Sequence, residues 1–174
     1  GTVIAALLGK NPLADLIQDT AVFNLFFLAS AEGLEDLGRS MVREEGYEAL
    51  FARCLGELDG ARFAYVVVDS PNQISPIMRN AIFPADLFVV PFESTKAVKS
   101  YANFYKLLME LRPKQDFVLL HVLNNLKPPG LRKRVIERLK EEQIPIARTE
   151  LRNCGWLARV DEHGGSIFEF RPRS

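Results

Sequence analysis

The chain has 174 residues, 48% of them hydrophobic, which favours a single globular domain over residues 1–174 with one core. Its 22 basic and 22 acidic side chains cancel, which excludes a polybasic protein held to nucleic acid or an anionic membrane by net charge. Two cysteines and two histidines are too few for a plausible zinc site. The sequence has no run of about 18 apolar residues and no signal-peptide pattern, so we expect a cytoplasmic protein with no membrane contact.

Segments of strand character alternate with segments of helical period along the chain. This pattern is typical of an α/β fold with a mostly parallel sheet and helices on both faces. The predicted strands are short apolar runs at 22–29, 63–69, 87–91, 117–124 and 167–170, with a short sixth at 144–146. The predicted helices lie between them, at 12–18, 33–58, 74–81, 95–112 and 129–142.

Two of the predicted helices carry a clear apolar stripe, which indicates the side that packs on the core. In the helix at 129–142 the stripe consists of Leu131, Val135, Ile136 and Leu139. In the helix at 95–112 it consists of Val98, Tyr101, Ala102, Tyr105, Leu108 and Met109. We interpret these aromatic side chains as core residues. Neither histidine has a neighbouring Cys or Ser with which to act on a substrate, so His121 and His163 are interpreted as structural.

The apolar run at 63–68 ends in Asp69, which Ser70 and Pro71 follow. A strand that is apolar throughout must be covered on both faces, which favours an interior position in a parallel sheet. Asp69 would then lie at the carboxyl end of its strand, where ligands of open α/β sheets bind. A carboxylate there suits a nucleotide-bound Mg²⁺. The alternative is that Asp69 only opens an Asx turn before Pro71, and both interpretations stay open at this point.

Taken in order, several segments resemble the ParA/MinD family of deviant P-loop ATPases, and most of all the ParA-type partition proteins. Residues 24–30 are similar to the family's strand that ends in a small residue and Ser, and residues 66–71 (VVVDSP) to its Asp-x-Pro-Pro motif. Residues 79–81 (Arg-Asn-Ala) are similar to the family's Arg-Asn-Ala-Leu motif. Residues 85–91 (ADLFVVP) are similar to its Ala-Ala-Asp motif and the buried strand that follows. Residues 146–152 and 163–174 resemble its IPRNVRL loop and its HGKP…YDPRS ending.

The family's first strand and its phosphate-binding loop, K-G-G-x-x-K-[ST], are not found in these 174 residues. The single Gly-Lys pair, Gly9-Lys10, has no following Ser or Thr. A sheet without this central strand would leave buried N–H and C=O groups unpaired. We therefore expect the sequence to be the downstream part of a longer P-loop ATPase. The alternative is a divergent relative that rebuilds its sheet in another way.

The resemblance implies that ATP and Mg²⁺ are the cofactors and that Asp69 is the catalytic residue, holding Mg²⁺ through water. Ser70 and Pro71 would shape the switch that senses the γ-phosphate, although Asn72 replaces the family's second proline. Asn124 or Asn125 would contact adenine, unless the pair only begins a loop. Ala147 stands where the family has a proline beside the adenine ring.

The resemblance also implies nonspecific DNA binding, because Arg148 corresponds to a loop arginine that contacts DNA phosphates in ParA-type proteins. Arg152, Lys127 and Arg132 would extend this basic surface. Other basic residues of the helix at 129–142 have the spacing of ordinary surface ion pairs, namely Lys133 with Glu137 and Arg138 with Glu142.

The implied function is that of a ParA-like partition ATPase. Such a protein forms a homodimer with ATP, binds nonspecific DNA, is associated with the nucleoid, and is stimulated by a ParB-like protein to segregate or position a plasmid, a chromosome or other cargo. The alternative is a non-hydrolysing regulatory or scaffold domain of the same fold that binds a protein partner. A membrane-cycling protein of the MinD type would need an amphipathic C-terminal helix, and no such pattern occurs through Ser174.

Overall fold

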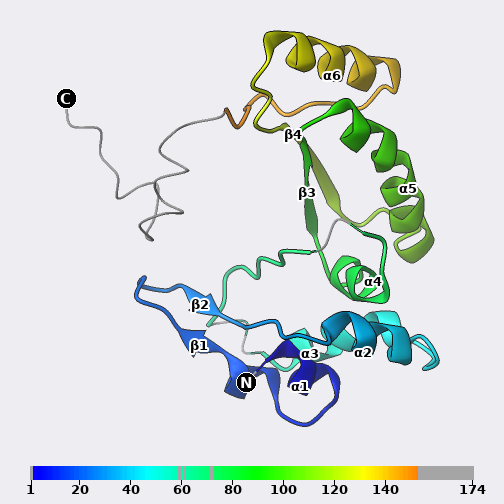
Figure 1. Cartoon of the computed structure of the whole chain (residues 1–174). Helices are drawn as coiled ribbons and strands as arrows, with labels where there is room; N and C mark the ends of the chain where they lie inside the picture. The colour runs from blue at the N-terminus through cyan, green and yellow to red at the C-terminus, as the bar shows by residue number, and fades with distance from the viewer. Residues whose placement is uncertain (1, 59, 61, 71–72, 153–174) are drawn as a thin grey trace. The chain divides into compact units, whose positions relative to one another are not determined.

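The computed structural model describes residues 2–58, 60, 62–70 and 73–152. These residues divide into two compact units (Figure 1). Unit 1 comprises Gly1–Asp86 and Leu107–Asp116, and unit 2 comprises Leu87–Lys106 and Phe117–Ser174. The single domain expected for residues 1–174 stays a prediction.

Unit 2 contains a parallel pair of strands, β3 (Leu87–Phe92) and β4 (Val118–Leu123). Helix α5 (Thr95–Leu111) connects them, and its last turn belongs to unit 1. A parallel pair needs such a crossover, because a tight turn can join only antiparallel strands. The predicted strands at 87–91 and 117–124 and the predicted helix at 95–112 are therefore confirmed, together with the parallel α/β class.

The core of unit 2 lies where α6 (Pro129–Glu141) packs against the carboxyl ends of β3 and β4. Val135 and Leu139 of the predicted stripe are fully buried, and Leu131 and Ile136 pack around them. Because the stripe recurs every three or four residues, it keeps one side of α6 on the core and leaves the charged side exposed. The predicted helix at 129–142 is confirmed.

The stripe predicted for α5 is only partly buried. Val98 and Leu108 are 3% and 0% exposed, whereas Tyr105 is 38% exposed and Ala102 is also exposed. Interpreting every residue of this stripe as core was therefore wrong. Tyr101 is half-buried and its hydroxyl lies 2.8 Å from Nε2 of His121, and burial raises the pKa of Tyr101 to about 12.

His121 itself is a buried residue of β4, with 4% of its surface exposed. Its ring stacks on Phe92 and meets Tyr101 edge-on. Burial lowers its pKa, because the charged form is poorly solvated there. This packing agrees with a structural role for His121, whereas His163 lies outside the described residues.

Unit 1 is built from short elements. Its helices and 3₁₀ turns are α1 (Val3–Leu7), η1 (Leu13–Leu16), α2 (Leu34–Met41), η2 (Tyr47–Ala49), α3 (Leu50–Gly56) and α4 (Pro76–Ile82). Helix α1 was not predicted, and the helix expected at 12–18 is only the turn η1. The helix predicted at 33–58 is two helices, because Gly46 adopts a left-handed φ of 71° between them. Helix α4 confirms the element expected at 74–81.

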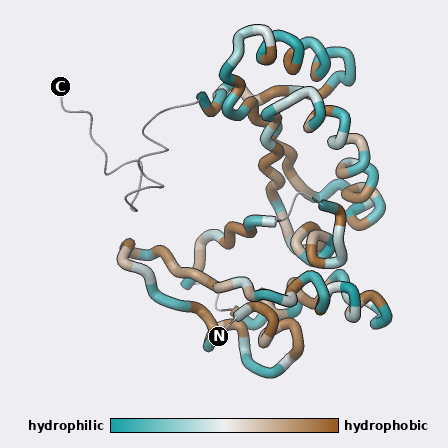
Figure 2. The backbone as a smooth tube through the Cα atoms, viewed as in Figure 1, coloured by the Kyte–Doolittle hydropathy of each residue, from teal (hydrophilic) through white to brown (hydrophobic). Residues whose placement is uncertain are grey.

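Of the two strands predicted in unit 1, one is much shorter than expected and the other is wrong. Of residues 22–29 only β2 (Phe26–Phe27) is a strand, and it pairs antiparallel with β1 (Gln18–Asp19). Residues 63–69 form no strand; within this segment Tyr65 and Val67 are 89% and 93% exposed. Figure 2 shows that the segment is as hydrophobic in sequence as the true strands. Hydrophobicity alone does not make a strand, because each strand needs a hydrogen-bonded neighbour, and none of the described residues provides one here.

The short strand expected at 144–146 is also absent. The first backbone hydrogen bond from this segment to β4 comes one residue later, where the N–H of Ala147 donates to the carbonyl of His121 at 2.8 Å. The N–H of Leu151 then donates to the carbonyl of Leu123 at 2.9 Å, and Leu151 forms an isolated parallel bridge with Asn124. The strand expected at 167–170 lies outside the described residues.

Candidate functional site

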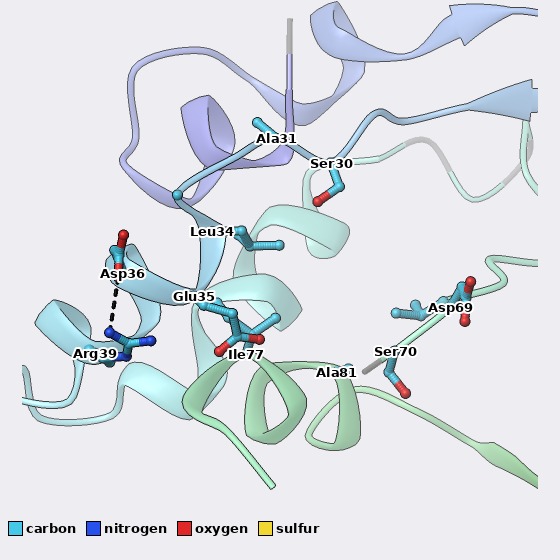
Figure 3. Close-up of a pocket in the computed structure, with 12 residues that line it drawn as sticks. Ser30, Ala31, Leu34, Glu35, Asp36, Arg39, Asp69, Ser70, Ile77 and Ala81 are labelled. Carbon is cyan, nitrogen blue, oxygen red and sulfur yellow. Dashed lines mark ion pairs between the residues drawn. The ribbon is translucent and has the colours of Figure 1, made fainter. Parts of the chain in front are cut away.

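A cavity of about 500 Å³ in unit 1 brings together residues from two segments of the ParA-type resemblance. Ser30 ends the first segment, residues 24–30, and Asp69 and Ser70 belong to the second, residues 66–71. Figure 3 shows Asp69 and Ser70 on an extended segment at one side of this cavity, with Glu35 at the other. The cavity is lined by Ser30, Ala31, Gly33, Leu34, Glu35, Asp36, Arg39, Val68, Asp69, Ser70, Ile77 and Ala81.

The helices beside this cavity are held together by a close contact and a polar link. A Cβ atom added to Gly38 of α2 would lie 2.9 Å from Cγ1 of Ile77 in α4, so the two helices approach closely there. Ser75 caps α4, because its Oγ accepts the N–H of Met78 at 3.2 Å. The same hydroxyl donates to Oε1 of Glu35 at 3.3 Å, which ties the start of α4 to α2.

Asn80 of the R-N-A segment has a structural task. Its side chain is 3% exposed and joins α4 to the first turn of α3. Oδ1 accepts the N–H of Phe51 at 3.1 Å, and Nδ2 donates to the carbonyl of Pro76 at 3.2 Å. A buried amide of this kind is stable only when it is hydrogen-bonded, which explains the need for Asn.

Asp69 is an exposed carboxylate at the rim of the cavity, with Ser70 beside it. Among the described residues no group of three or more His, Cys, Asp or Glu side chains is placed to hold a metal ion. One carboxylate does fit the role of holding a water of a Mg²⁺ that is bound mainly by phosphates, since Mg²⁺ usually keeps several waters. Pro71 and Asn72, the next two residues of the predicted switch, lie outside the described residues.

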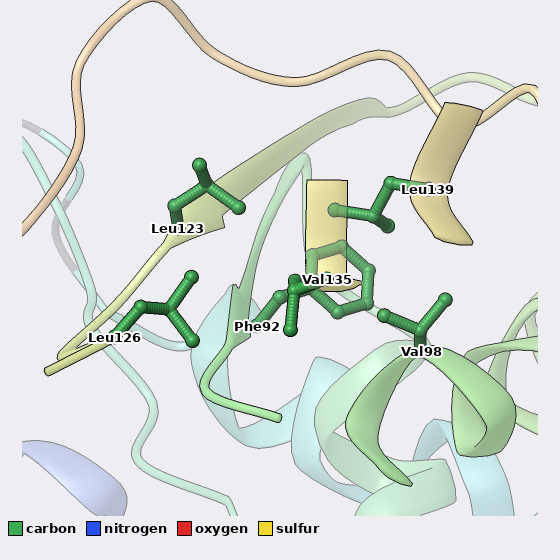
Figure 4. Packing of buried hydrophobic residues seen from close by; sticks show 6 residues of the cluster. All are labelled: Phe92, Val98, Leu123, Leu126, Val135 and Leu139. Carbon is green, nitrogen blue, oxygen red and sulfur yellow. The ribbon is translucent and has the colours of Figure 1, made fainter. Parts of the chain in front are cut away.

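In unit 2, Asn124 and Asn125 directly follow β4 and lie beside the core that fixes the strand ends. Figure 4 shows Phe92 and Leu123, the last residues of β3 and β4, within this core. The N–H of Asn124 donates to the carbonyl of Phe92 at 3.1 Å, and that of Asn125 to the carbonyl of Leu151 at 2.8 Å. Asn125 adopts a left-handed φ of 53°. The two asparagines therefore end the strand and begin a loop, as both predicted interpretations require.

The predicted DNA-binding residues of unit 2 differ in their surroundings. Arg148, Arg152 and Lys127 are exposed. Arg132 instead pairs with Glu150, whose Oε2 accepts from Nη2 at 2.8 Å and from Nε at 3.0 Å. These hydrogen bonds hold the pKa of the Glu150 carboxyl below its usual range. Arg132 is therefore less available to a phosphate than the other three residues.

The surface ion pairs predicted for α6 are confirmed. Nζ of Lys133 lies 3.8 Å from Oε1 of Glu137, and Nη2 of Arg138 lies 2.8 Å from Oε1 of Glu142. Ala147, the predicted neighbour of adenine, is half-buried and is held by its hydrogen bond to β4.

Two carboxylates at these positions were missed by the sequence reasoning. Glu35 lines the cavity with Asp69, and Glu93 accepts a hydrogen bond from Nδ2 of Asn124 at 2.9 Å. Glu93 follows β3 in the way that Asn124 follows β4. The position directly after a predicted strand was thus the available signal for Glu93, and no comparable signal marked Glu35.

Comparison with known proteins defines the class. Similar solved structures include apo McdA from Cyanothece, with a TM-score of 0.82, 20% identity and coverage of 97% of this chain and 70% of that one. An ATP complex of a McdA variant gives a TM-score of 0.79 at 20% identity, with 94% and 69% covered. A plasmid partition protein from Borrelia burgdorferi gives 0.69 at 20% identity, with 80% and 58% covered. These similarities show a P-loop NTPase fold of the ParA type.

A family model described as an AAA domain matches residues 1–122, and the chain belongs to this family, among the ParA/MinD-like deviant P-loop ATPases. A curated relative, the cell division protein PomZ of Myxococcus xanthus, is 25% identical over 179 residues. The alignment covers 99% of this chain and 56% of PomZ, so the chain spans about half the length of that relative. Within the described part of the chain, no helix is long and apolar enough to cross a membrane.

Proposed function

We propose that this chain acts within a ParA-like partition ATPase, which couples ATP-dependent dimerisation and nonspecific DNA binding to the segregation or positioning of cargo. The observation that carries the proposal is the meeting of Ser30, Asp69 and Ser70 at one cavity. These residues belong to two separate segments of the family resemblance, and a ligand site brings such segments together. The names of the relatives, a cell division protein and a plasmid partition protein, agree with a role in positioning.

In this proposal Asp69 would accept a hydrogen bond from a water molecule that is bound to Mg²⁺. Ser70 and Pro71 would form the turn that responds to the γ-phosphate. Bound Mg²⁺ would supply charge neutralisation at the phosphates. Asn124 or Asn125, with Ala147, would contact the adenine ring. The phosphate-binding loop of the family, K-G-G-x-x-K-[ST], does not occur in the 174 residues.

Nonspecific DNA binding would use Arg148 and Arg152, with Lys127 at the edge of the surface, since all three are exposed. Contacts of this kind reach phosphate oxygens and carry no base readout, so they serve any nucleoid sequence. The protein would work as a homodimer in the cytoplasm, associated with the nucleoid. A ParB-like protein would stimulate ATP hydrolysis and the release of the dimer from DNA.

The second candidate is a non-hydrolysing regulatory or scaffold domain that binds a protein partner. This candidate does not need a K-G-G-x-x-K-[ST] motif, and none occurs in the 174 residues. ATP binding and hydrolysis by the complete gene product, with and without Mg²⁺, distinguish the two. Mg²⁺-dependent turnover that DNA and a partner protein increase would support the ATPase. Binding without turnover would support the scaffold, and no ATP binding at all would overturn the proposed ATPase.

A further inference from the structure

Glu93 and Asn124 form a polar pair at the carboxyl ends of two adjacent parallel strands. Phe92 of β3 is in register with Leu123 of β4, so the next residue of each strand lies beside the other. Nδ2 of Asn124 donates to Oε1 of Glu93 at 2.9 Å, and the N–H of Asn124 donates to the carbonyl of Phe92 at 3.1 Å. This edge of a parallel sheet is where ligands of α/β folds bind.

The hydrogen bond to Glu93 fixes the orientation of the Asn124 side-chain amide. An ionised carboxylate can only accept hydrogen bonds, so the NH₂ group of the amide must point toward it. The carbonyl Oδ1 of Asn124 is then turned away from Glu93. A ligand at this edge therefore meets the Oδ1 acceptor and the second carboxylate oxygen of Glu93, which is exposed.

We infer that Glu93 is a positioning residue, which holds Asn124 so that the site accepts a purine with an amino group at position 6 and rejects one with a keto oxygen at that position. This inference rests on the proposed function, because it concerns the base of the proposed nucleotide. Adenine presents a donor, its N6 amino group, where guanine presents the acceptor O6. The two fixed acceptors can accept hydrogen bonds from the N6 amino group of adenine. The O6 atom of guanine would instead face two oxygens that also carry negative partial charge, and would be repelled.

A purely structural role for Glu93 would also explain the contact, since the pair ties the end of β3 to the end of β4. The two roles separate in the variant Glu93→Gln. Glutamine keeps the length of the side chain and can still hydrogen-bond Asn124, so the tie persists. Because it offers both a donor and an acceptor, it allows Asn124 to turn either way, and the discrimination between bases is lost.

The test measures dissociation constants of the complete gene product for ATP and GTP, with Mg²⁺, by calorimetry. The unmodified protein should prefer ATP, and Glu93→Gln should reduce the ATP-to-GTP preference by about tenfold or more, the range of one charge-assisted hydrogen bond. Its thermal midpoint should stay unchanged. Glu93→Ala should reduce the preference as well, whereas Glu137→Gln, which removes an exposed charge from α6, should leave it unaltered.

An unchanged preference in both Glu93 variants would overturn the inference while leaving the ATPase proposal intact. Equal affinity of the unmodified protein for the two nucleotides would overturn it in the same way. Failure of the unmodified protein to bind either nucleotide would overturn the proposed function, and this inference with it.

Discussion

The side-chain Oδ1 of Asn80 accepts the backbone N–H of Phe51 at 3.1 Å and so connects α4 to α3. Asn80→Ala removes this bond from a buried site that is 3% exposed. We expect the free energy of unfolding to fall by about 1–3 kcal/mol, since a buried N–H loses its partner. Chemical denaturation measures the change, with the exposed Asn103→Ala as the control. Equal stability of the two variants would show that Phe51 finds another acceptor.

Arg112 holds the end of α4. Its Nη1 donates to the carbonyls of Phe83 and Ala85 at 2.7 and 2.9 Å, and its Nε donates to Oδ1 of Asp116 at 3.0 Å. We expect Arg112→Ala to lower the unfolding free energy by about 2 kcal/mol, because the two carbonyls, of which that of Ala85 is partly buried, lose a charged donor. Arg112→Lys should recover less than half of this loss, since an ammonium lacks the planar fork. If Arg112→Lys had the unfolding free energy of the unmodified protein, the positive charge of Arg112 would account for its whole contribution to stability.

The parts of the fold that the sequence predicted well are those with local causes. The β3–α5–β4 unit and α6 follow from short-range apolar periodicity, and Asn124 was marked by its position after a strand. The strand expected at 63–69 failed because pairing depends on a neighbour that no local pattern contains. The prediction of one helix at 33–58 failed because Gly46, whose left-handed φ interrupts the helix, looks in the sequence like any glycine that a helix tolerates.

The candidate site was predictable to a similar extent. Asp69 and Ser70 were marked by the apolar run before them, and they lie at the cavity. Glu35 was hidden, because its contact with Ser75 joins residues 40 positions apart. Long-range side-chain pairs of this kind leave no periodic trace in a single sequence.

The role proposed for Asp69 predicts a loss of chemistry without a loss of folding. Asp69→Ala should reduce ATP turnover by the complete gene product at least about a hundredfold, since charge stabilisation at the phosphates depends on the positioned Mg²⁺. The side chain is exposed, so the thermal midpoint should change little. Steady-state phosphate release measures the turnover, and Asp15→Ala is an exposed control. Turnover that survives in Asp69→Ala would remove this residue from the active site.

The basic surface near Arg148 makes a prediction about salt. Arg148→Glu should weaken DNA binding uniformly across sequences and reduce the slope of log affinity against log salt by about one, the effect of one lost phosphate contact. Nucleotide affinity should stay the same. Fluorescence anisotropy with duplexes of different sequence provides the measurement, and Arg43→Glu is a control with the same charge change in unit 1. Equal salt slopes for the two variants would contradict the assignment.

Stability should depend on pH through His121. Burial holds its pKa below the usual value of 6.5, so below that pH the unfolded chain binds a proton that the folded chain does not. The contribution of His121 is therefore fully present above pH 6.5 and is lost as the pH falls through the folded-state pKa. The unfolding free energy should fall more steeply from about pH 7 to about pH 5 than it does in His121→Gln. If the unfolding free energies of the two proteins depended on pH in the same way, the imidazole of His121 would take up its proton in the folded protein as readily as in the unfolded chain.

The exposed apolar stretch from Ala64 to Val68 has a practical consequence for anyone who purifies this chain. Extended backbone with bare amides and β-branched side chains is a template on which a second molecule adds readily. Recombinant yield, light scattering and storage lifetime should therefore be governed by these five residues more than by the well-packed βαβ unit. A single lysine in place of Val67, which is 93% exposed, offers a simple means of keeping the sample monodisperse.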